Sequence, residues 1–513
     1  MKLSVKEYKE KMLGCWMGKN IGGVLGAPFE GLRQINNVDY YIQDLHGAPP
    51  ANDDLDLQLV WLNAVEEYGN KVNAGILGEY WLSFIIPDWV EYGAGKNNLR
   101  MGLLPPISGY LDNAYRDSDG CFIRSEIWAC LAPGNPDIAV RYAYEDGIVD
   151  HAGEGVYGEL FCAAIQSSAF VENDMERLVK IGLSYIPEDC DVAKAVYVAM
   201  NAYKSGKTWQ QARVDVLTAV PGTFGVQSCQ MKDIPNDVPV GKPGYDTPSN
   251  IGIMMIGWLY GEGDFGKSIC IANNCGEDTD CTAATLGAIL GIAGGLTAIP
   301  QKWIAPIGDK ITTCCINMLN GGISIPSTVT ELTDRLLRVT PLFLGPKMCD
   351  ILCDSGYTIN VKSADDLFCK NEEQYIRGIN GQGKPTKPTI KDLIKSPYIV
   401  RHTFSTFNVD VDYESEPYIE LNEDKKIKLI LSSNKNNQNH QWVTIKWYTQ
   451  DGVEISPAYQ SFFLKSTYLE KTEIEYTIHM LDLNKEKVEL IADISVNGRH
   501  TNGLVKIILI PHM

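Results

Sequence analysis

Histidine is scarce in this chain of 513 residues, and basic side chains are outnumbered by acidic ones. Only His46 and His151 precede residue 400, so that part of the chain cannot supply a zinc site made of several histidines. The 45 Lys and Arg residues against 64 Asp and Glu residues give a formal net charge of −19, which repels phosphate backbones. We therefore expect no nucleic-acid partner.

The sequence also lacks any apolar run of about 18 residues, and its N-terminal segment has no apolar stretch typical of export signals. We expect no membrane partner and a cytoplasmic location.

All 14 cysteines lie at or before Cys369 at irregular spacings, which argues against a disulfide framework. Cys314 and Cys315 are adjacent, and Cys349 lies close to Cys353, but neither pair has a second pair or a histidine nearby. We expect these thiols to be reduced and buried, without zinc or redox chemistry.

What the chain does have is the composition of a globular protein, with 45% hydrophobic and 21% charged residues. Its length exceeds that of a typical domain of roughly 100–200 residues, so two or more domains are expected. From residue 5 to about residue 345 the apolar residues recur at helical spacing, as in Leu55, Leu59 and Leu62. Residues 1–345 are therefore predicted to form a large all-α domain.

The pattern changes after residue 345. Residues 346–397 are predicted to be a connector, because their second half is rich in Gly and Pro. From residue 398 apolar and polar residues alternate, as in Ile427, Leu429 and Leu431, which predicts a smaller all-β antiparallel sandwich over residues 398–513. Asn497-Gly498 is predicted to turn a hairpin. Residues 225–250 are expected to form a long surface loop over the helical domain.

Two clusters of acids begin predicted helices. Asn52 is a good N-cap, and Asp53 and Asp54 follow it in the first turn, where the helix dipole favours anions. Asp278 and Asp280 begin a helix rich in Ala and Gly, which suits tight burial. Helix capping explains each cluster taken alone. If the two clusters meet in space, their carboxylates repel one another unless a cation neutralises them, and hard oxygen ligands favour Mg²⁺.

A stripe of glycines precedes these clusters. The glycines at 14, 18, 22 and 26 are four residues apart, so they leave one helix face smooth and allow another helix to pack closely. Taken alone, this stripe indicates packing. Glu30 follows shortly after Pro28, just past the predicted helix, where its carboxylate can face a cleft.

Together, the glycine stripe with Glu30 and the two clusters of acids resemble the motifs of the ADP-ribosylglycohydrolase superfamily, whose relatives include the dinitrogenase reductase-activating glycohydrolases. The stretch from Gly14 to Glu30 is similar to the family's first, glycine-rich motif, and Asn52-Asp53-Asp54 is similar to its Thr-Asp-Asp. The stretch from Gly276 to Ala284 is similar to the family's Gly-Gly-Asp-Thr-Asp-Thr-Asn-Ala-Ala. The stretch from Asp119 to Arg124 is similar to its central Asn-Gly-x-x-Met-Arg. The resemblance covers about residues 8–340.

The resemblance implies a compact all-α fold with two Mg²⁺ ions at the base of a cleft. It also implies an enzyme that hydrolyses the glycosidic bond at the anomeric carbon of a ribofuranose. The implied catalytic residues are Glu30, Asp54 and Asp278, with Glu30 positioning or activating water. The implied substrate-binding residues are Asp119 and Gly120. The implied metal ligands are Asn52, Asp53, Asp54, Asp278, Asp280 and Cys281. We therefore expect one or two Mg²⁺ ions as cofactor, with Mn²⁺ as an alternative.

The chain departs from the family pattern at three of these positions. Asn52 replaces the family's threonine, and its amide oxygen can still bind a hard cation. Cys281 replaces a ligand threonine, and a thiol is a poor partner for Mg²⁺, which predicts that one metal is weakly bound or absent. Asp119 replaces the family's asparagine and adds a carboxylate, which disfavours an anionic ADP-ribose substrate.

Three functions stay open at this point. The first is a metal-dependent hydrolase that cleaves an ADP-ribosyl or related ribofuranosyl bond. The second is a glycoside hydrolase acting on a neutral O-linked furanoside or oligosaccharide, which the acidic balance favours. The third is a non-catalytic binding or structural protein that retains the fold, which Asn52 and Cys281 motivate.

The expected partner follows from these readings: a small molecule, an ADP-ribosylated substrate or a sugar. The sequence is also compatible with a homo-oligomer. Trp442 and Trp447 of the predicted β domain are expected to lie in its core rather than to form a sugar platform.

Overall fold

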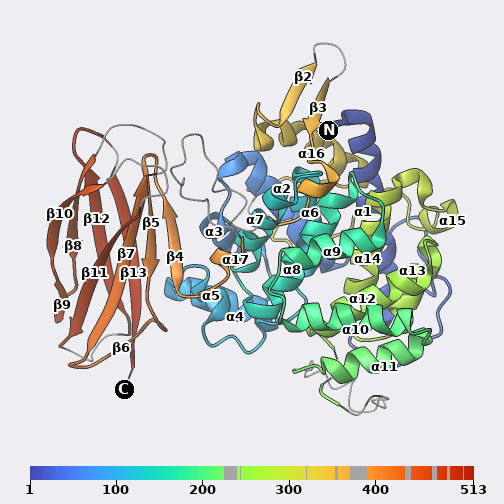
Figure 1. The fold of residues 1–513 in the computed structure, drawn as a ribbon, viewed down its shortest axis with the longest axis horizontal. Helices are drawn as coiled ribbons and strands as arrows, with labels where there is room; N and C mark the ends of the chain where they lie inside the picture. Colours follow the sequence, from blue (N-terminus) through green and yellow to red (C-terminus); the bar gives the residue numbers. More distant parts are fainter. Residues whose placement is uncertain are drawn as a thin grey trace. The chain divides into compact units, whose positions relative to one another are not determined.

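The structure is a computed structural model, and it describes residues 1–223, 238, 240–242, 244–318, 321–352, 356–369, 390–433, 441–464, 471–481, 486–500 and 502–512. The chain forms two compact units, Met1–Asn97 with Asp112–Cys369, and Asn98–Leu111 with Lys370–Met513. The first unit is mainly helical and the second is built mainly from β-strands (Figure 1). The predicted fold class, a large all-α domain followed by a smaller β domain, is confirmed.

The helices of the first unit carry the candidate site, and α4 continues into the second unit. They are α1 (Val5–Gly26), α2 (Asp53–Tyr68), α3 (Ala74–Phe84), α4 (Val90–Met101), α6 (Glu126–Leu131), α7 (Pro136–Gly147), α8 (Gly153–Ala169), α9 (Met175–Ser184), α10 (Asp191–Lys204), α11 (Trp209–Ala219), α12 (Thr247–Gly261), α13 (Phe265–Asn274), α14 (Thr279–Gly294), α15 (Gln301–Ile304) and α16 (Val329–Leu344). Among the described residues, no helix combines the length and the apolar character needed to cross a membrane.

The glycine stripe of α1 packs closely against another helix, as the sequence predicts, and that helix is α14. A Cβ atom on Gly14, Gly18 or Gly22 would lie 2.2, 2.0 or 2.1 Å from a backbone carbonyl oxygen of α14, which is far closer than atoms can approach. A Cβ atom on Gly26 would lie 2.3 Å from the amide nitrogen of Asp280. The two backbones therefore touch over several turns, and the end of α1 is held beside the start of α14.

A small sheet ties the N-terminus to the end of the first unit. It consists of β1 (Lys2–Ser4), β3 (Gly356–Asn360) and β2 (Cys349–Leu352), in that order and antiparallel. Because β3 pairs with β1 and β2 pairs with β3, the first unit extends beyond residue 345 to Cys369. The predicted connector 346–397 thus includes these strands, and its residues 370–389 lie outside the described residues, as do most of residues 225–239 of the predicted loop.

The second unit contains two short helices and ten strands that the structure describes. They are α5 (Ile107–Tyr110), α17 (Ile390–Leu393), β4 (Ile399–Thr403), β5 (Phe407–Asp412), β6 (Tyr418–Glu420), β7 (Asp424–Ser433), β8 (Gln441–Tyr448), β9 (Val453–Ser456), β10 (Tyr459–Leu464), β11 (Lys471–Met480), β12 (Val488–Val496) and β13 (Asn502–His512).

These strands form two five-stranded sheets, in the orders β10-β8-β12-β13-β6 and β4-β5-β7-β11-β9 (Figure 1). The strand pairs within them are antiparallel except for β6 with β13. Residues from both sheets, such as Leu429 and Leu490, bury their side chains in one core because every second residue faces inward. Gly498 has a φ of +77° in the turn between β12 and β13, so the predicted hairpin is confirmed.

The two tryptophans of β8 lie on opposite faces of their sheet. Trp447 is 6% exposed, so its predicted core position is confirmed. Trp442 is 52% exposed and contacts the ring of Phe463 on β10, so its predicted core position is wrong. The period of two explains the difference, because Trp442 is out of phase with the buried Val443 and Ile445 whereas Trp447 is in phase with them.

Candidate functional site

The first turn of α2 carries two of the predicted metal ligands. Asn52 is its N-cap, as predicted, because its side-chain oxygen accepts a hydrogen bond from the amide of Asp54 at 2.7 Å. This fixes the start of the helix and leaves the carboxylate of Asp53 half-buried and that of Asp54 buried. The hydroxyl of Tyr92 on α4 donates a hydrogen bond to Asp53 Oδ2 at 3.4 Å. The oxygen of Asn52 that we expected to bind metal thus accepts one backbone hydrogen bond.

The start of α14 carries the other acids and lies directly against α2. Asp278 is the N-cap residue of α14, and Asp280 follows in its first turn. The side-chain nitrogen of Asn52 donates to Asp280 Oδ2 at 3.0 Å, and the thiol of Cys281 donates to Asp54 Oδ1 at 3.4 Å. The two acidic clusters, which are more than 200 residues apart in the sequence, therefore meet, as the hypothesis of a shared cation requires.

Glu30 lies at the exposed edge of the same cluster. A carboxylate oxygen of Glu30 and one each from Asp278 and Asp280 lie within 4.8 Å of one another. Repulsion from Asp280, followed by desolvation and repulsion from Asp53, raises the pKa of Glu30 to about 9 in the metal-free protein. The hydroxyl of Tyr245 donates a hydrogen bond to Glu30 Oε1 at 3.3 Å and holds the carboxylate in place.

Asp119 joins the cluster from the loop before α6. Its carboxylate lies within 4.8 Å of ligand atoms of Asp278 and Cys281. Asn250 on α12 holds both acids, because its side-chain nitrogen donates to Asp119 Oδ2 at 2.6 Å and its oxygen accepts from the amide of Asp278 at 3.1 Å. Gly120 lies against Glu91, since a Cβ atom there would be 2.3 Å from Glu91 Oε1. Of the two predicted substrate-binding residues, Asp119 is thus a direct neighbour of the acids.

Burial and mutual repulsion both raise the pKa values of Asp53, Asp54 and Asp278. Burial raises the pKa of Asp54 and Asp278, and repulsion from Asp119 adds to the effect at Asp278. Burial and then repulsion from Asp280 raise the pKa of Asp53 to about 6. The ammonium of Lys19 opposes the shift at Asp54, but its distance of 4.0 Å from Asp54 Oδ2 exceeds a hydrogen bond.

Several carboxylate oxygens of the cluster are buried without a hydrogen-bond partner among the described residues: Asp54 Oδ2, Asp278 Oδ1 and Asp280 Oδ1. Buried polar atoms normally have a partner, so these oxygens indicate that something else binds there. A hard divalent cation fits a donor set made of carboxylates. The thiol of Cys281 is the one poor donor in the predicted ligand set, and it points to Asp54 instead.

A small cavity of about 20 Å³ lies beside Asp54. That volume has room for one water molecule. Its lining includes Lys19, Asn52, Leu55 and Thr312. The residue Thr312 belongs to the segment that follows α15, so this segment also borders the site.

Sequence reasoning missed several residues that support the acids. Tyr92, Tyr245 and Asn250 each bind a carboxylate or the backbone of the cluster. Arg33 binds both carboxylate oxygens of the buried Glu277, at 2.5 and 3.0 Å, and so fixes the turn that leads into Asp278. Glu277 directly precedes Asp278 within the matched motif, which is the one sequence signal that could have suggested this role.

A second group of buried acids lies in the same unit and is paired with an arginine. Arg124 donates to Asp146 Oδ1 at 2.8 Å and to both carboxylate oxygens of Asp150. Burial would raise the pKa of Asp150, but Arg124 outweighs it and the pKa is lowered. His151 is buried next to this group and shares a hydrogen bond with Ser118 at 2.8 Å, so it is a core histidine.

The geometry defines a helical protein in which acids from α2, α14 and two loops form one cluster, buried except at Glu30 and partly at Asp53, that is suited to a hard divalent cation. The profile of the ADP-ribosylglycohydrolase family matches residues 4–341. The chain belongs to this family, and the resemblance expected from the motifs is confirmed. A glycohydrolase-type function follows at the level of the family.

Two further proteins are similar to this chain. An uncharacterized protein of Archaeoglobus fulgidus is 23% identical over 314 residues, which cover 59% of this chain and 93% of that protein. A solved structure described as an ADP-ribosylglycohydrolase-related protein complex is 18% identical with a TM-score of 0.43, and the match covers 66% of this chain and 99% of that one.

Proposed function

We propose that the chain is a metal-dependent hydrolase that cleaves an ADP-ribosyl or related ribofuranosyl glycosidic bond. The observation that carries the proposal is the meeting of Asp53 and Asp54 with Asp278 and Asp280, with three of their oxygens buried and unpartnered among the described residues. These four acids would hold one or two Mg²⁺ ions, or Mn²⁺ in their place. The cytoplasmic location expected from the sequence is part of the same proposal.

The chain's own residues have separate roles in this proposal. A bound cation would neutralise the carboxylates that hold it and would act as a Lewis acid toward water and the sugar hydroxyls, whereas the carboxylates themselves would favour the positive charge that develops at the anomeric centre. Glu30 is the one carboxylate of the cluster that is exposed, so it can reach a water molecule and accept its proton. Tyr245 orients Glu30. Asn250 binds both Asp119 and the backbone at the start of α14 and so fixes their relative positions. The substrate would therefore meet a fixed arrangement of acids.

The leading test is hydrolysis with and without Mg²⁺, using ADP-ribosylarginine, ADP-ribosylserine and aryl furanosides as substrates. We expect release of ADP-ribose that depends on Mg²⁺ or Mn²⁺ and falls by at least about 100-fold in Asp54→Asn. Lys180→Met, which changes an exposed residue on α9, is the matched control and should keep full activity. Hydrolysis that survives both chelation and the Asp54→Asn change would overturn the metal-dependent mechanism.

A neutral O-linked furanoside is the second candidate substrate class, and one observation favours it. Asp119 replaces a neutral asparagine of the family pattern and lies among the other acids, where its negative charge would repel a diphosphate. If this reading is correct, aryl furanosides are turned over and ADP-ribosyl substrates are not, and Asp119→Asn shifts the preference toward ADP-ribose. A chain that binds no divalent metal, and that hydrolyses none of these substrates when Mg²⁺ or Mn²⁺ is supplied, would favour the non-catalytic hypothesis.

A further inference from the structure

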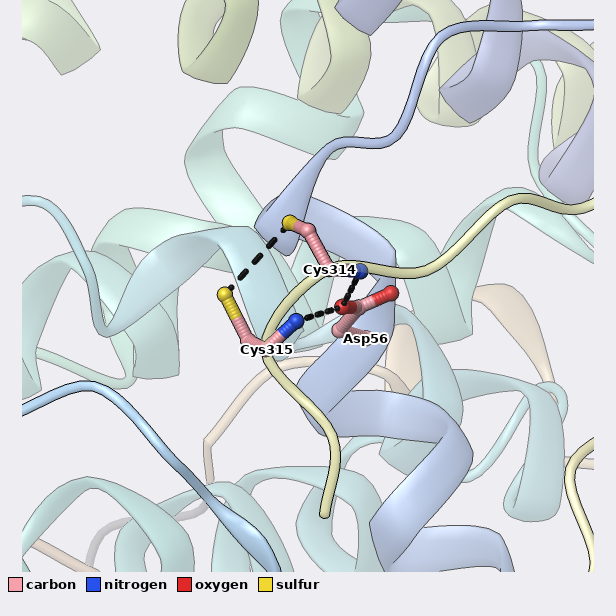
Figure 2. A group of neighbouring side chains, drawn as sticks. All are labelled: Asp56, Cys314 and Cys315. Carbon is pink, nitrogen blue, oxygen red and sulfur yellow. Dashed lines mark hydrogen bonds between the residues drawn. The ribbon is translucent and has the colours of Figure 1, made fainter. Parts of the chain in front are cut away.

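Cys314 and Cys315 lie side by side on the segment that follows α15, and their backbone is fixed by an acid of α2. The amides of both cysteines donate to Asp56 Oδ2, each at 2.7 Å (Figure 2). The same segment also pairs with the end of α3, because the amide of Ile86 donates to the carbonyl of Cys315 at 2.9 Å. The positions of both thiols are therefore set by backbone contacts on two sides.

The two sulfur atoms point toward one another and lie 3.5 Å apart (Figure 2). Both cysteines are free, and they differ in exposure: Cys315 is 1% exposed, whereas Cys314 is exposed, contrary to the buried position expected from the sequence. Two sulfurs at this separation can each lie about 2.3 Å from one ion, which is the usual zinc–sulfur distance. The pair can thus bind one cation and present it to solvent on the side of Cys314.

Asp56 supplies a third ligand to this group. Its side chain is fully buried, and its Oδ1 has no hydrogen-bond partner among the described residues. A carboxylate oxygen of Asp56 and the sulfurs of Cys314 and Cys315 all lie within 4.8 Å of one another. In Figure 2 the oxygen of Asp56 on the side of the sulfurs is the one that accepts the two amide hydrogen bonds, and the unpartnered Oδ1 lies on the far side. One carboxylate oxygen beside two thiols is a ligand set that suits a cation that accepts both oxygen and sulfur.

We propose that Asp56, Cys314 and Cys315 form a second cation site, for a thiophilic divalent ion of the Zn²⁺ class. Three protein ligands leave one coordination position, which water fills on the exposed side. Each thiol that binds the ion releases its proton to solvent. The site differs in chemistry from the acid cluster, where the ligands are hard oxygens, so the two sites select different metals.

The test uses the full chain, stripped of metal and kept reduced, and titrated with Co²⁺ as a coloured substitute for Zn²⁺. We expect a sulfur-to-cobalt charge-transfer band that saturates at one equivalent and disappears when Zn²⁺ is added. Cys314→Ser and Cys315→Ser should lose the band. Asp56→Asn should weaken Co²⁺ binding by about 10-fold or more.

Two control variants keep this test separate from the proposed hydrolase. Cys369→Ser removes a partly exposed thiol elsewhere, and Asp54→Asn removes a carboxylate of the acid cluster. Both should keep the band. A band that is absent in the wild-type chain, or that survives in Cys314→Ser, would overturn the site, as would a band that disappears in Cys281→Ser but not in Cys314→Ser. Because Cys314 is exposed, its substitution by Ser should not prevent folding, and the circular dichroism spectrum checks this.

Discussion

Two groups of buried acids lie in the helical unit, and the described residues neutralise them differently. Asp146 and Asp150 are bound by the guanidinium of Arg124. Asp278 and Asp280 instead lie next to other carboxylates and keep one unpartnered oxygen each among the described residues. The comparison shows that burial alone does not mark a functional acid. What distinguishes the candidate site is burial of several carboxylates without enough positive charge from the protein, which a bound cation must supply.

The largest effect on stability is expected from removing the charge that neutralises the paired group. Arg124→Met leaves two buried carboxylates without their guanidinium partner, so the free energy of unfolding should fall by about 3–5 kcal/mol. Urea unfolding of the metal-free chain measures this. The matched control is Lys180→Met, which breaks an exposed pair with Glu176 and should cost less than about 1 kcal/mol. Equal losses in the two variants would show that the paired acids do not depend on Arg124.

A pair of Asp→Asn changes should act on stability with opposite signs. In metal-free protein Asp278→Asn removes a repelling charge, so stability should stay level or rise by up to about 1 kcal/mol. Asp146→Asn removes a partner of Arg124 and should lower stability. Thermal unfolding followed by circular dichroism compares the two. A clear loss of stability in Asp278→Asn would contradict the view that the cluster is overcharged without metal.

A smaller effect on the stability of the metal-free protein is expected from a change in pH. The pKa of Asp53 is raised to about 6 and that of Glu30 to about 9 in metal-free protein. The folded state therefore binds these protons more tightly than the unfolded state, so the stabilisation is present at low pH and is lost as pH rises through the raised values. The melting temperature without metal should fall between about pH 5 and about pH 9.

Asp280→Asn should flatten this decline, because Asp280 is the largest cause of the shift at Glu30. Saturating Mg²⁺ should also reduce the fall in melting temperature with rising pH, since the cation favours the charged carboxylates. A melting temperature that rises over this range in metal-free wild-type protein would rule out the repulsion that we infer.

The sequence patterns predicted the parts of the fold and site that depend on local periodicity. The glycines four residues apart predicted the close contact of α1, and Asn52 predicted the start of α2. The alternation after residue 398 predicted the strands, and the phase of that alternation in β8 would have placed Trp442 outside had we applied it residue by residue.

Other features depend on contacts between distant residues and have no local pattern. Tyr245 and Asn250 lie in and next to a loop with no motif, yet they hold Glu30 and Asp119. Residues 98–111 read as part of a helical domain, but they join the second unit, where Leu103 and Ile107 enter the core of the two sheets. Helical spacing shows that a segment has an apolar face, and it does not show which core that face will enter.

The most direct test of the central claim is to locate the cation itself. Crystals grown with Mn²⁺ and measured for anomalous scattering should show a peak bound by Asp54 or Asp53 from α2 and by Asp278 or Asp280 from α14. The peak should vanish in crystals of Asp278→Asn. Ordered crystals of the wild-type chain in saturating Mn²⁺ with no peak bridging the two helices would contradict the account.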